Sequence, residues 1–199
     1  MMVQTIPYAS MILRLDRCAG SALSLPPGCS IRTYEPGDES AWARMETEAG
    51  DFPVQEEAES YFRKTFLAEP ERISRDGFFL LSGGEVAGSC IAWHTEKNGK
   101  EAGLLHWLVV AEKYRGRGYA RTLCTAVLNR FAETGLAPVY LHTQPQSWKA
   151  VLLYVSMGFR IQGTDTFSGK ANEYASAMEI LGSVLTADQM RLLAEASDP

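Results

Sequence analysis

The chain has 199 residues, 46% of them hydrophobic, which is enough to build the core of one soluble globular domain. Its formal net charge of −5 at pH 7 argues against nucleic acid as the main partner, because phosphate backbones select basic surfaces. No apolar run approaches the roughly 20 residues of a membrane-spanning helix, and the N-terminus lacks the order of a secretory signal, so we expect a cytoplasmic protein without a membrane partner.

The N-terminal part of the chain predicts an extension, a strand and two helices. Residues 1–29 are irregular and end in LPPGC, which predicts an extension packed on the domain. A strand, a Pro-Gly turn and a helix follow, with Asp38 as the candidate N-cap and Gly50 as the candidate stop. Residues 54–70 predict a second helix, ended by Pro70.

The rest of the chain predicts a mixed sheet. Three apolar stretches between residues 77 and 111 are separated by Gly-Gly and by Asn-Gly, which are typical of hairpin turns. The pattern then changes to strand 104–110, helix 117–134, strand 138–144, helix 147–157 and a last strand near 174–181. Helix-linked crossovers imply parallel pairing, so the expected fold class is α/β (α+β) with a mixed, mostly antiparallel sheet.

We expect three segments along the chain. They are the N-terminal extension 1–29, a globular domain over 30–182 and a helical tail over 183–199. A Thr186 to Gln189 capping box predicts that the tail is a short amphipathic helix. The sequence does not distinguish a monomer from a homodimer.

Charge is distributed unevenly along the sequence. Residues 31–60 hold nine Asp or Glu against two Arg, whereas residues 112–121 hold four Lys or Arg against Glu112. We interpret the acidic stretch as a solvated helix face and the basic stretch as a candidate anion site. The four cysteines and three histidines are scattered, so neither a disulfide framework nor a metal site is expected.

The basic stretch VVAEKYRGRGYA joins a predicted strand to a predicted helix. Glycines at such a junction let backbone N–H groups converge at a helix N-terminus, which suits phosphate. Gly116 and Gly118 do not have the spacing of a nucleotide-hydrolase phosphate loop, and Arg121 stands where a dinucleotide fingerprint needs glycine. These departures weaken the hypothesis of a nucleotide-binding oxidoreductase. A tight turn without a ligand is a further interpretation of the glycine pair.

Two motifs carry a resemblance to a known family. The stretch VVAEKYRGRGYA resembles the acetyl-CoA-binding signature [QR]-x-x-G-x-[GA] of the Gcn5-related N-acetyltransferase (GNAT) family, at Arg115, Gly118 and Ala120. The stretch SWKAVLLYVSMGF resembles the second signature, A-x-x-L-Y-x-x-x-G-F, at Ala150, Leu153, Tyr154, Gly158 and Phe159. The resemblance covers about residues 31–181 and implies the GNAT fold, whose sheet contains a splayed strand pair.

The resemblance also implies an acetyl-CoA site and no metal. The residues implied in cofactor binding are Leu108, Val109, Val110, Arg115, Gly116, Arg117, Gly118, Tyr119, Ala120 and Ser147. The loop would wrap the pyrophosphate, and the preceding strand would bond the pantetheine. The chain departs from the family at Glu112, where proline is frequent, and at Ser147, where many members have asparagine.

His106 is the candidate base. Alternation places Leu104, His106, Leu108 and Val110 on one apolar face, where burial disfavours the charged imidazole and leaves a neutral base. LHWLVV resembles the corresponding strand of the arylalkylamine N-acetyltransferases, whose catalytic histidine falls at His106, although Leu104 replaces a second histidine. A hydrogen-bonded core histidine is the alternative.

Tyr154 is the candidate acid. Its helical spacing alone predicts a core tyrosine, whereas the resemblance matches its phenol to the family's usual proton donor for the coenzyme sulfur. An unperturbed pKa of about 10 suits an acid that stays protonated until a thiolate forms. His142, Gln144 and Arg160 are weaker candidates, and His142 is expected more as a structural residue than as a substrate contact.

The resulting hypothesis is an acetyl-CoA-dependent N-acetyltransferase. The acceptor would be a primary amine, on a small molecule or on a peptide or protein, that attacks the thioester directly in a ternary complex. The alternative is a catalytically silent acyl-CoA-binding sensor of the same fold.

Overall fold

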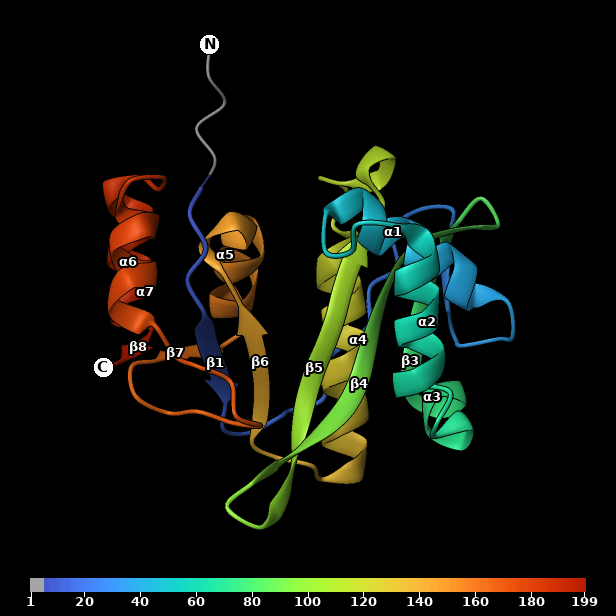
Figure 1. The fold of residues 1–199 in the computed structure, drawn as a ribbon, viewed down its shortest axis with the longest axis horizontal. Helices are drawn as coiled ribbons and strands as arrows, with labels where there is room; N and C mark the ends of the chain where they lie inside the picture. Colours follow the sequence, from blue (N-terminus) through green and yellow to red (C-terminus); the bar gives the residue numbers. More distant parts are fainter. Residues whose placement is uncertain (1–5) are drawn as a thin grey trace. The chain divides into compact units, whose positions relative to one another are not determined.

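A computed structural model describes residues 6–199 of the chain. These residues form a mixed α/β fold with an eight-stranded sheet, in the order β2-β3-β4-β5-β6-β1-β7-β8 (Figure 1). The strands are β1 (Met11–Leu15), β2 (Cys29–Thr33), β3 (Gly77–Ser82), β4 (Glu85–Lys97), β5 (Lys100–Val110), β6 (Val139–Thr143), β7 (Arg160–Gln162) and β8 (Ser197–Asp198). The expected fold class is confirmed.

Helices flank this sheet. The α-helices are α1 (Asp38–Ala49), α2 (Gln55–Thr65), α3 (Pro70–Asp76), α4 (Tyr119–Thr134), α5 (Trp148–Ser156), α6 (Tyr174–Gly182) and α7 (Ala187–Glu195). Two 3₁₀ turns, η1 (Glu112–Tyr114) and η2 (Pro145–Ser147), precede α4 and α5. In the described residues no helix is long and apolar enough to cross a membrane.

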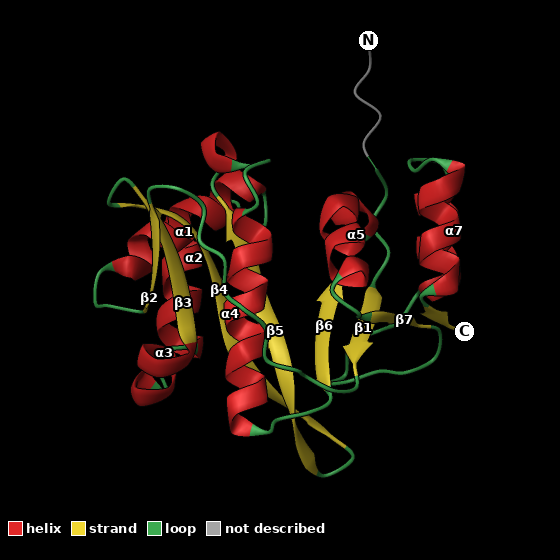
Figure 2. Cartoon of the chain, turned by 180° about the vertical axis from the view of Figure 1, so that it is seen from behind, coloured by secondary structure: helices red, strands yellow, loops and turns green. Residues whose placement is uncertain are grey.

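The chain divides into two compact units. The central unit comprises Ala19–Trp93 and Leu105–Gly135, and the terminal unit comprises the described residues up to Cys18, His94–Leu104 and Leu136–Pro199. Strands β4 and β5 run through both. In the central unit, α1 and α2 cover one face of the sheet and α4 covers the other (Figures 1 and 2).

The predicted meander is confirmed. Strands β3, β4 and β5 follow one another through Gly83–Gly84 and Asn98–Gly99, and all four of these turn residues have positive φ, as a type I′ hairpin turn requires. The predicted stop of α1 is also confirmed, because Gly50 closes the helix with φ 90°. Asp38, however, is the first helical residue, and Gly37 takes the N-cap position.

The prediction that residues 1–29 are only an irregular extension is wrong for Met11–Leu15. These residues form β1, which pairs antiparallel with both β6 and β7, and the side chains of Met11, Ile12 and Leu13 are fully buried. A strand near the N-terminus therefore supplies the middle of the terminal unit's sheet. The boundaries of the three expected segments stay a prediction.

Two predicted elements are corrected. The last strand expected near 174–181 is the helix α6, whose buried residues Ala177 and Leu181 are four positions apart, as on one helical face. Pro70 does not end the second helix. That helix ends at Thr65, and Pro70 begins α3, where its missing N–H costs no hydrogen bond.

The core of the central unit is a cluster of rings, which we call the ring cluster. Its members are Trp42, Phe52, Tyr61, Phe62, Phe66, Trp93, His106 and Trp107. Trp42 of α1 is fully buried and lies 5.1 to 6.2 Å, between ring centroids, from five of them. Such ring pairs add stabilisation beyond their buried area, so α1 and α2 are firmly packed on β5.

Candidate active site

The loop between β5 and α4 leaves the start of that helix open. Gly116 and Gly118 have φ values of 77° and 84°, and Gly118 is the N-cap of α4. No side chain caps the helix, and its first turn carries no acidic residue. A Cβ at either glycine would meet nothing within 4 Å, so glycine is required there by the backbone and not by packing.

Basic side chains surround this open start. Arg115 and Arg117 are exposed; Arg115 Nε donates to the Val110 carbonyl at 3.1 Å, and the Arg117 guanidinium lies 5.6 Å from the Tyr114 ring. Tyr119, by contrast, is buried, and its hydroxyl lies 3.0 Å from Ser82 Oγ. Tyr119 therefore offers a ligand its backbone and not its side chain. The combination of a helix start without a side-chain cap, the helix dipole and arginines suits an anion.

The strand before the loop is irregular at Trp107. Its φ of 48° is in the left-handed region, which a bulky residue adopts at a cost. Two consecutive side chains consequently enter the ring cluster: His106 lies 6.0 Å from Phe66, and Trp107 lies 5.4 Å from Trp42. The predicted alternation of Leu104, His106, Leu108 and Val110 is therefore wrong beyond His106, because the pleat is interrupted.

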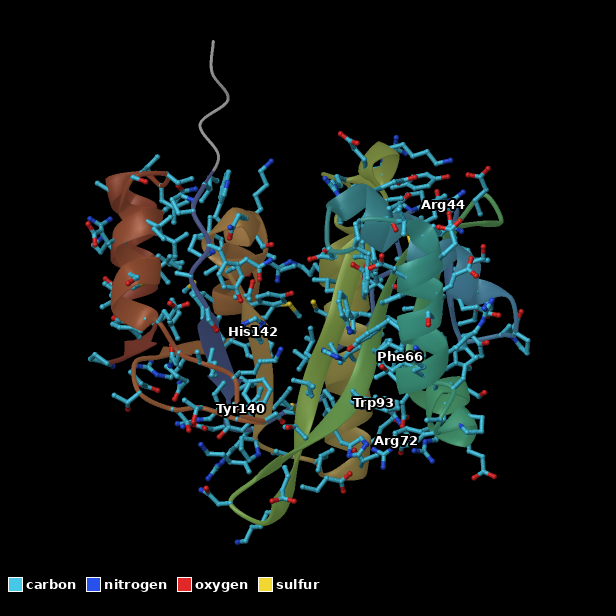
Figure 3. All side chains as sticks on the ribbon, in the orientation of Figure 1. Arg44, Phe66, Arg72, Trp93, Tyr140 and His142 are labelled. Atoms are coloured by element: carbon cyan, nitrogen blue, oxygen red, sulfur yellow. The ribbon has the colours of Figure 1, made fainter. Side chains whose placement is uncertain are left out.

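His106 is half-buried among rings. Its imidazole lies 5.5 Å from the Trp107 ring, and its carbonyl lies 3.8 Å from Cys90 Sγ. Trp107 Nε1 donates to the Tyr61 hydroxyl at 3.3 Å, which fixes the neighbouring ring. Figure 3 shows other members of the cluster, Phe66 and Trp93, pointing toward one another, with their ring centroids 5.1 Å apart.

In the terminal unit, Tyr154 and Ser147 lie in and just before α5. Tyr154 is 6% exposed, and its ring packs edge-on against Phe159 at 6.0 Å. Ser147 occupies the N-cap position of α5 without capping it, and its Oγ accepts a hydrogen bond from Gln144 Nε2 at 3.3 Å. Arg160 forms an ion pair with Asp198 across β7 and β8.

Glu46 of α1 is a buried carboxyl that the sequence pattern did not predict. It is 2% exposed, and its Oε1 has no hydrogen-bond partner in the described part of the chain. Burial raises the pKa of Glu46 well above its usual value, and the nearby charge of Asp51 adds to this. The interpretation of the acidic stretch as a solvated face is thus wrong at Glu46. Because Glu46 lies in a stretch rich in Asp and Glu, no local pattern in the sequence marked it as buried.

The described residues contain no candidate metal site. No group of three or more His, Cys, Asp or Glu is arranged there to hold an ion, and the four cysteines are free thiols.

Comparison with known proteins places this arrangement among the acetyltransferases. The model of the Acetyltransferase (GNAT) family matches residues 40–159. The mycothiol acetyltransferase of Thermobispora bispora is 34% identical over 147 residues, and that of Acidothermus cellulolyticus is 30% identical over 173 residues. These alignments cover 69% and 75% of this chain but 48% and 51% of the relatives, so the chain spans about half the length of the curated relatives it matches.

Solved structures share the fold at lower sequence identity. A GCN5-related N-acetyltransferase from Sphaerobacter thermophilus superposes with a TM-score of 0.59 at 22% identity, over 77% of this chain and 50% of that one. Arabidopsis thaliana Naa50, in complex with the bisubstrate analogue CoA-Ac-MVNAL, superposes with a TM-score of 0.53 at 19% identity, over 66% of this chain and 82% of that one.

Proposed function

The chain belongs to the GNAT acetyltransferase family, and from this membership we propose that it transfers an acetyl group from acetyl-CoA to a primary amine. The observation that carries the proposal is the open start of α4, where two positive-φ glycines and exposed arginines replace a side-chain cap. The family's acetyl-CoA signature falls on the same residues, 115–120.

The loop is proposed to hold the pyrophosphate of coenzyme A. Backbone N–H groups at Gly116, Gly118 and Ala120 would position it, and Arg115 and Arg117 would add charge-assisted contacts. Naa50, which shares the fold, is described in complex with an analogue that contains coenzyme A, and this supports the assignment.

The pantetheine arm is proposed to run along β5. The register between β5 and β6 pairs Gly103 with Val139 and Leu104 with Tyr140. The backbone around Leu108 and Val109 is proposed to bond the arm as a neighbouring strand would. Val110 and Ser147 are proposed as further contacts of the arm, and the Val110 carbonyl already accepts from Arg115 Nε at 3.1 Å.

The chemistry is a direct transfer in a ternary complex. The amine lone pair forms the C–N bond, the C–S bond breaks, and the departing sulfur takes a proton from Tyr154. His106 would receive the proton that leaves nitrogen as the amide forms. Holding the two substrates together contributes much of the rate, because a bimolecular step becomes an intramolecular one.

The acceptor is proposed as a primary amine without a narrower identity. The relatives named mycothiol acetyltransferases support a small-molecule acceptor, whereas the peptide-like part of the Naa50 analogue's name supports a peptide amine. Small-molecule and peptide acceptors both attack through a primary amine, so the proposed transfer step is the same for each.

The test combines binding and turnover. The protein is incubated with acetyl-CoA and a panel of small amines and of peptides with a free N-terminal amine, and release of the coenzyme A thiol is followed. Reactions without an amine are the control. We expect amine-dependent thiol release and a melting temperature raised by coenzyme A but not by NAD. Stabilisation by coenzyme A without thiol release for any amine would favour the silent sensor. Stabilisation by NAD alone would contradict both.

A further inference from the structure

Two carboxyl groups, Glu46 and Asp51, adjoin each other at the end of α1, and we call them the acid pair. The Asp51 N–H donates to the Glu46 carbonyl at 3.0 Å, and the two side chains are also hydrogen-bonded to each other. Glu46 is buried and its Oε1 has no hydrogen-bond partner in the described part of the chain, whereas Asp51 is exposed. The acid pair therefore extends from the core of the central unit to its surface.

No basic group of the described residues forms an ion pair with the acid pair. The two arginines of the acidic stretch are engaged with other acids, Arg32 with Asp38 at 2.6 Å and Arg44 with Glu48 at 4.0 Å. Burial raises the pKa of both carboxyls of the acid pair, and their proximity raises the pKa of the buried one further. The two carboxyls thus share a proton where a cation would otherwise neutralise them.

Aromatic rings belong to the same elements as the acid pair. Trp42 lies one turn before Glu46 on the same face of α1, and Phe52 follows Asp51 directly in the chain. The Phe52 ring stacks on the Trp107 ring, with centroids 5.4 Å apart, and lies 5.8 Å from the Trp42 ring. A cation that carboxylates hold beside ring faces gains additional electrostatic attraction. This combination suits an organic ammonium group.

The acid pair lies in the same compact unit as the proposed acetyl-CoA loop. Met45, the residue before Glu46, is buried in one cluster with Val109 and Ala111 at the end of β5. Trp107, on which the loop after α1 stacks, belongs to the same strand. The end of α1 is therefore packed on the part of β5 that is proposed to bond the pantetheine arm.

We propose that the acid pair binds a second ammonium group of the acceptor, and that the acceptor is an aliphatic diamine or polyamine. This inference rests on the proposed function and names the substrate class within it. The nitrogen held at the acid pair is not the one that reacts. Attack requires a lone pair, and a carboxylate beside an ammonium raises the pKa of that ammonium. The bound ammonium replaces the shared proton, which is released to solvent, and it positions the other amine for transfer.

The decisive experiment compares each diamine with the amino alcohol of the same chain length. The two compounds share the reacting amine and differ in the far group, which is an ammonium in one and a hydroxyl in the other. After correction for the two equivalent amines, we expect kcat/KM to be about tenfold higher, or more, for the preferred diamine, as a hydrogen bond to a charged group allows. A series of chain lengths identifies that diamine.

Two variants remove the charge of the acid pair and keep its shape. Glu46→Gln and Asp51→Asn should each reduce the ratio of the two kcat/KM values to about twofold or less. Glu48→Gln is the matched control, because it removes an exposed carboxylate from the same helix and should keep the wild-type ratio. Below the pKa of the amines, the wild-type ratio should increase as pH rises through the folded pKa of Glu46, since the cation binds the ionised acid pair.

Binding without acetyl-CoA provides a readout that does not depend on turnover. The preferred diamine should raise the melting temperature of wild type and of Glu48→Gln more than the amino alcohol does, and this difference should be absent in Glu46→Gln. Calorimetry in buffers of different ionisation enthalpy should detect the proton that the wild-type protein releases. No proton release would contradict the replacement of the shared proton.

Acetylation of amines with equal kcat/KM for every diamine and its amino alcohol would overturn the role of the acid pair and leave the proposed function intact. A diamine preference that persists in the folded Glu46→Gln and Asp51→Asn variants would overturn it as well. If the wild-type chain acetylates no amine, the proposed function is contradicted, and the acceptor role of the acid pair is overturned with it.

Discussion

Two helices of this chain begin in opposite ways. At α7 the Thr186 hydroxyl accepts from the Gln189 N–H at 3.3 Å, and the Gln189 side chain accepts from the Thr186 N–H at 3.0 Å, so the predicted capping box is confirmed. At α4 the N-cap is Gly118, and no side chain satisfies the first N–H groups. The first helix start is closed by its own residues. The second has no side-chain cap and relies on a glycine in the left-handed region at its N-cap.

The largest effect is expected for Tyr154→Phe, which should change kcat without changing the Kd for acetyl-CoA. In the proposed function the start of α4 binds coenzyme A and Tyr154 acts in the reaction. Tyr154→Phe should therefore lower kcat by about 100-fold while the Kd for acetyl-CoA is unchanged, since the hydroxyl matters as charge develops on sulfur. The phenylalanine ring keeps the contact with Phe159. Steady-state kinetics together with calorimetric titration measure the two constants. Unchanged kcat would return Tyr154 to a core role.

The next effect concerns the open start itself. Gly118→Asp places a carboxylate at the proposed pyrophosphate site and should weaken acetyl-CoA binding by about tenfold or more, which corresponds to about 1.4 kcal/mol. Gly118→Asn is the matched control, because asparagine has the same shape and tolerates the left-handed backbone equally well. Thermal shifts with acetyl-CoA measure both. Equal behaviour of Asp and Asn would mean that no anion binds at this helix start.

A smaller effect is expected at the closed start. Thr186→Ala removes the cap and should lower the free energy of unfolding by about 1 kcal/mol, or the melting temperature by about 2–4 °C. Acetyl-CoA affinity should not change. Thr186→Ser keeps a capping hydroxyl and should remain close to wild type. If the Ala variant loses acetyl-CoA binding at unchanged stability, the contrast between the two helix starts is wrong.

The smallest effect at acidic pH is expected for Glu46→Gln. Burial and the Asp51 charge raise the pKa of Glu46, so folding favours the protonated carboxyl, which glutamine resembles in shape. The stability that the protonated carboxyl contributes is fully present below the unfolded pKa and is lost as pH rises through the folded pKa. Melting temperatures of wild type and variant should therefore agree at acidic pH and diverge above it, with the variant more stable. Parallel curves at all pH values would contradict this.

Much of the fold could be predicted from local signals. The two hairpin dipeptides, the Gly50 stop, the glycine loop and the Thr186 capping box each depend on backbone angles or hydrogen bonds within a few neighbouring residues, and all appear in the structure. The loop and Tyr154 were found because they belong to compact motifs. Their proposed roles remain for the experiments above.

What only the tertiary structure decided involves partners far apart in the chain. The place of β1 between β6 and β7 and the burial of Glu46 are set by long-range packing. The left-handed backbone of Trp107 and the bond between Ser10 and His142, 132 positions apart, likewise leave no local pattern. Sequence by itself determined where the chain turns and which helix starts carry a side-chain cap, because those features are governed by adjacent residues. Which strand pairs with which, and which polar group is buried, was decided by the tertiary context that overrides local preference.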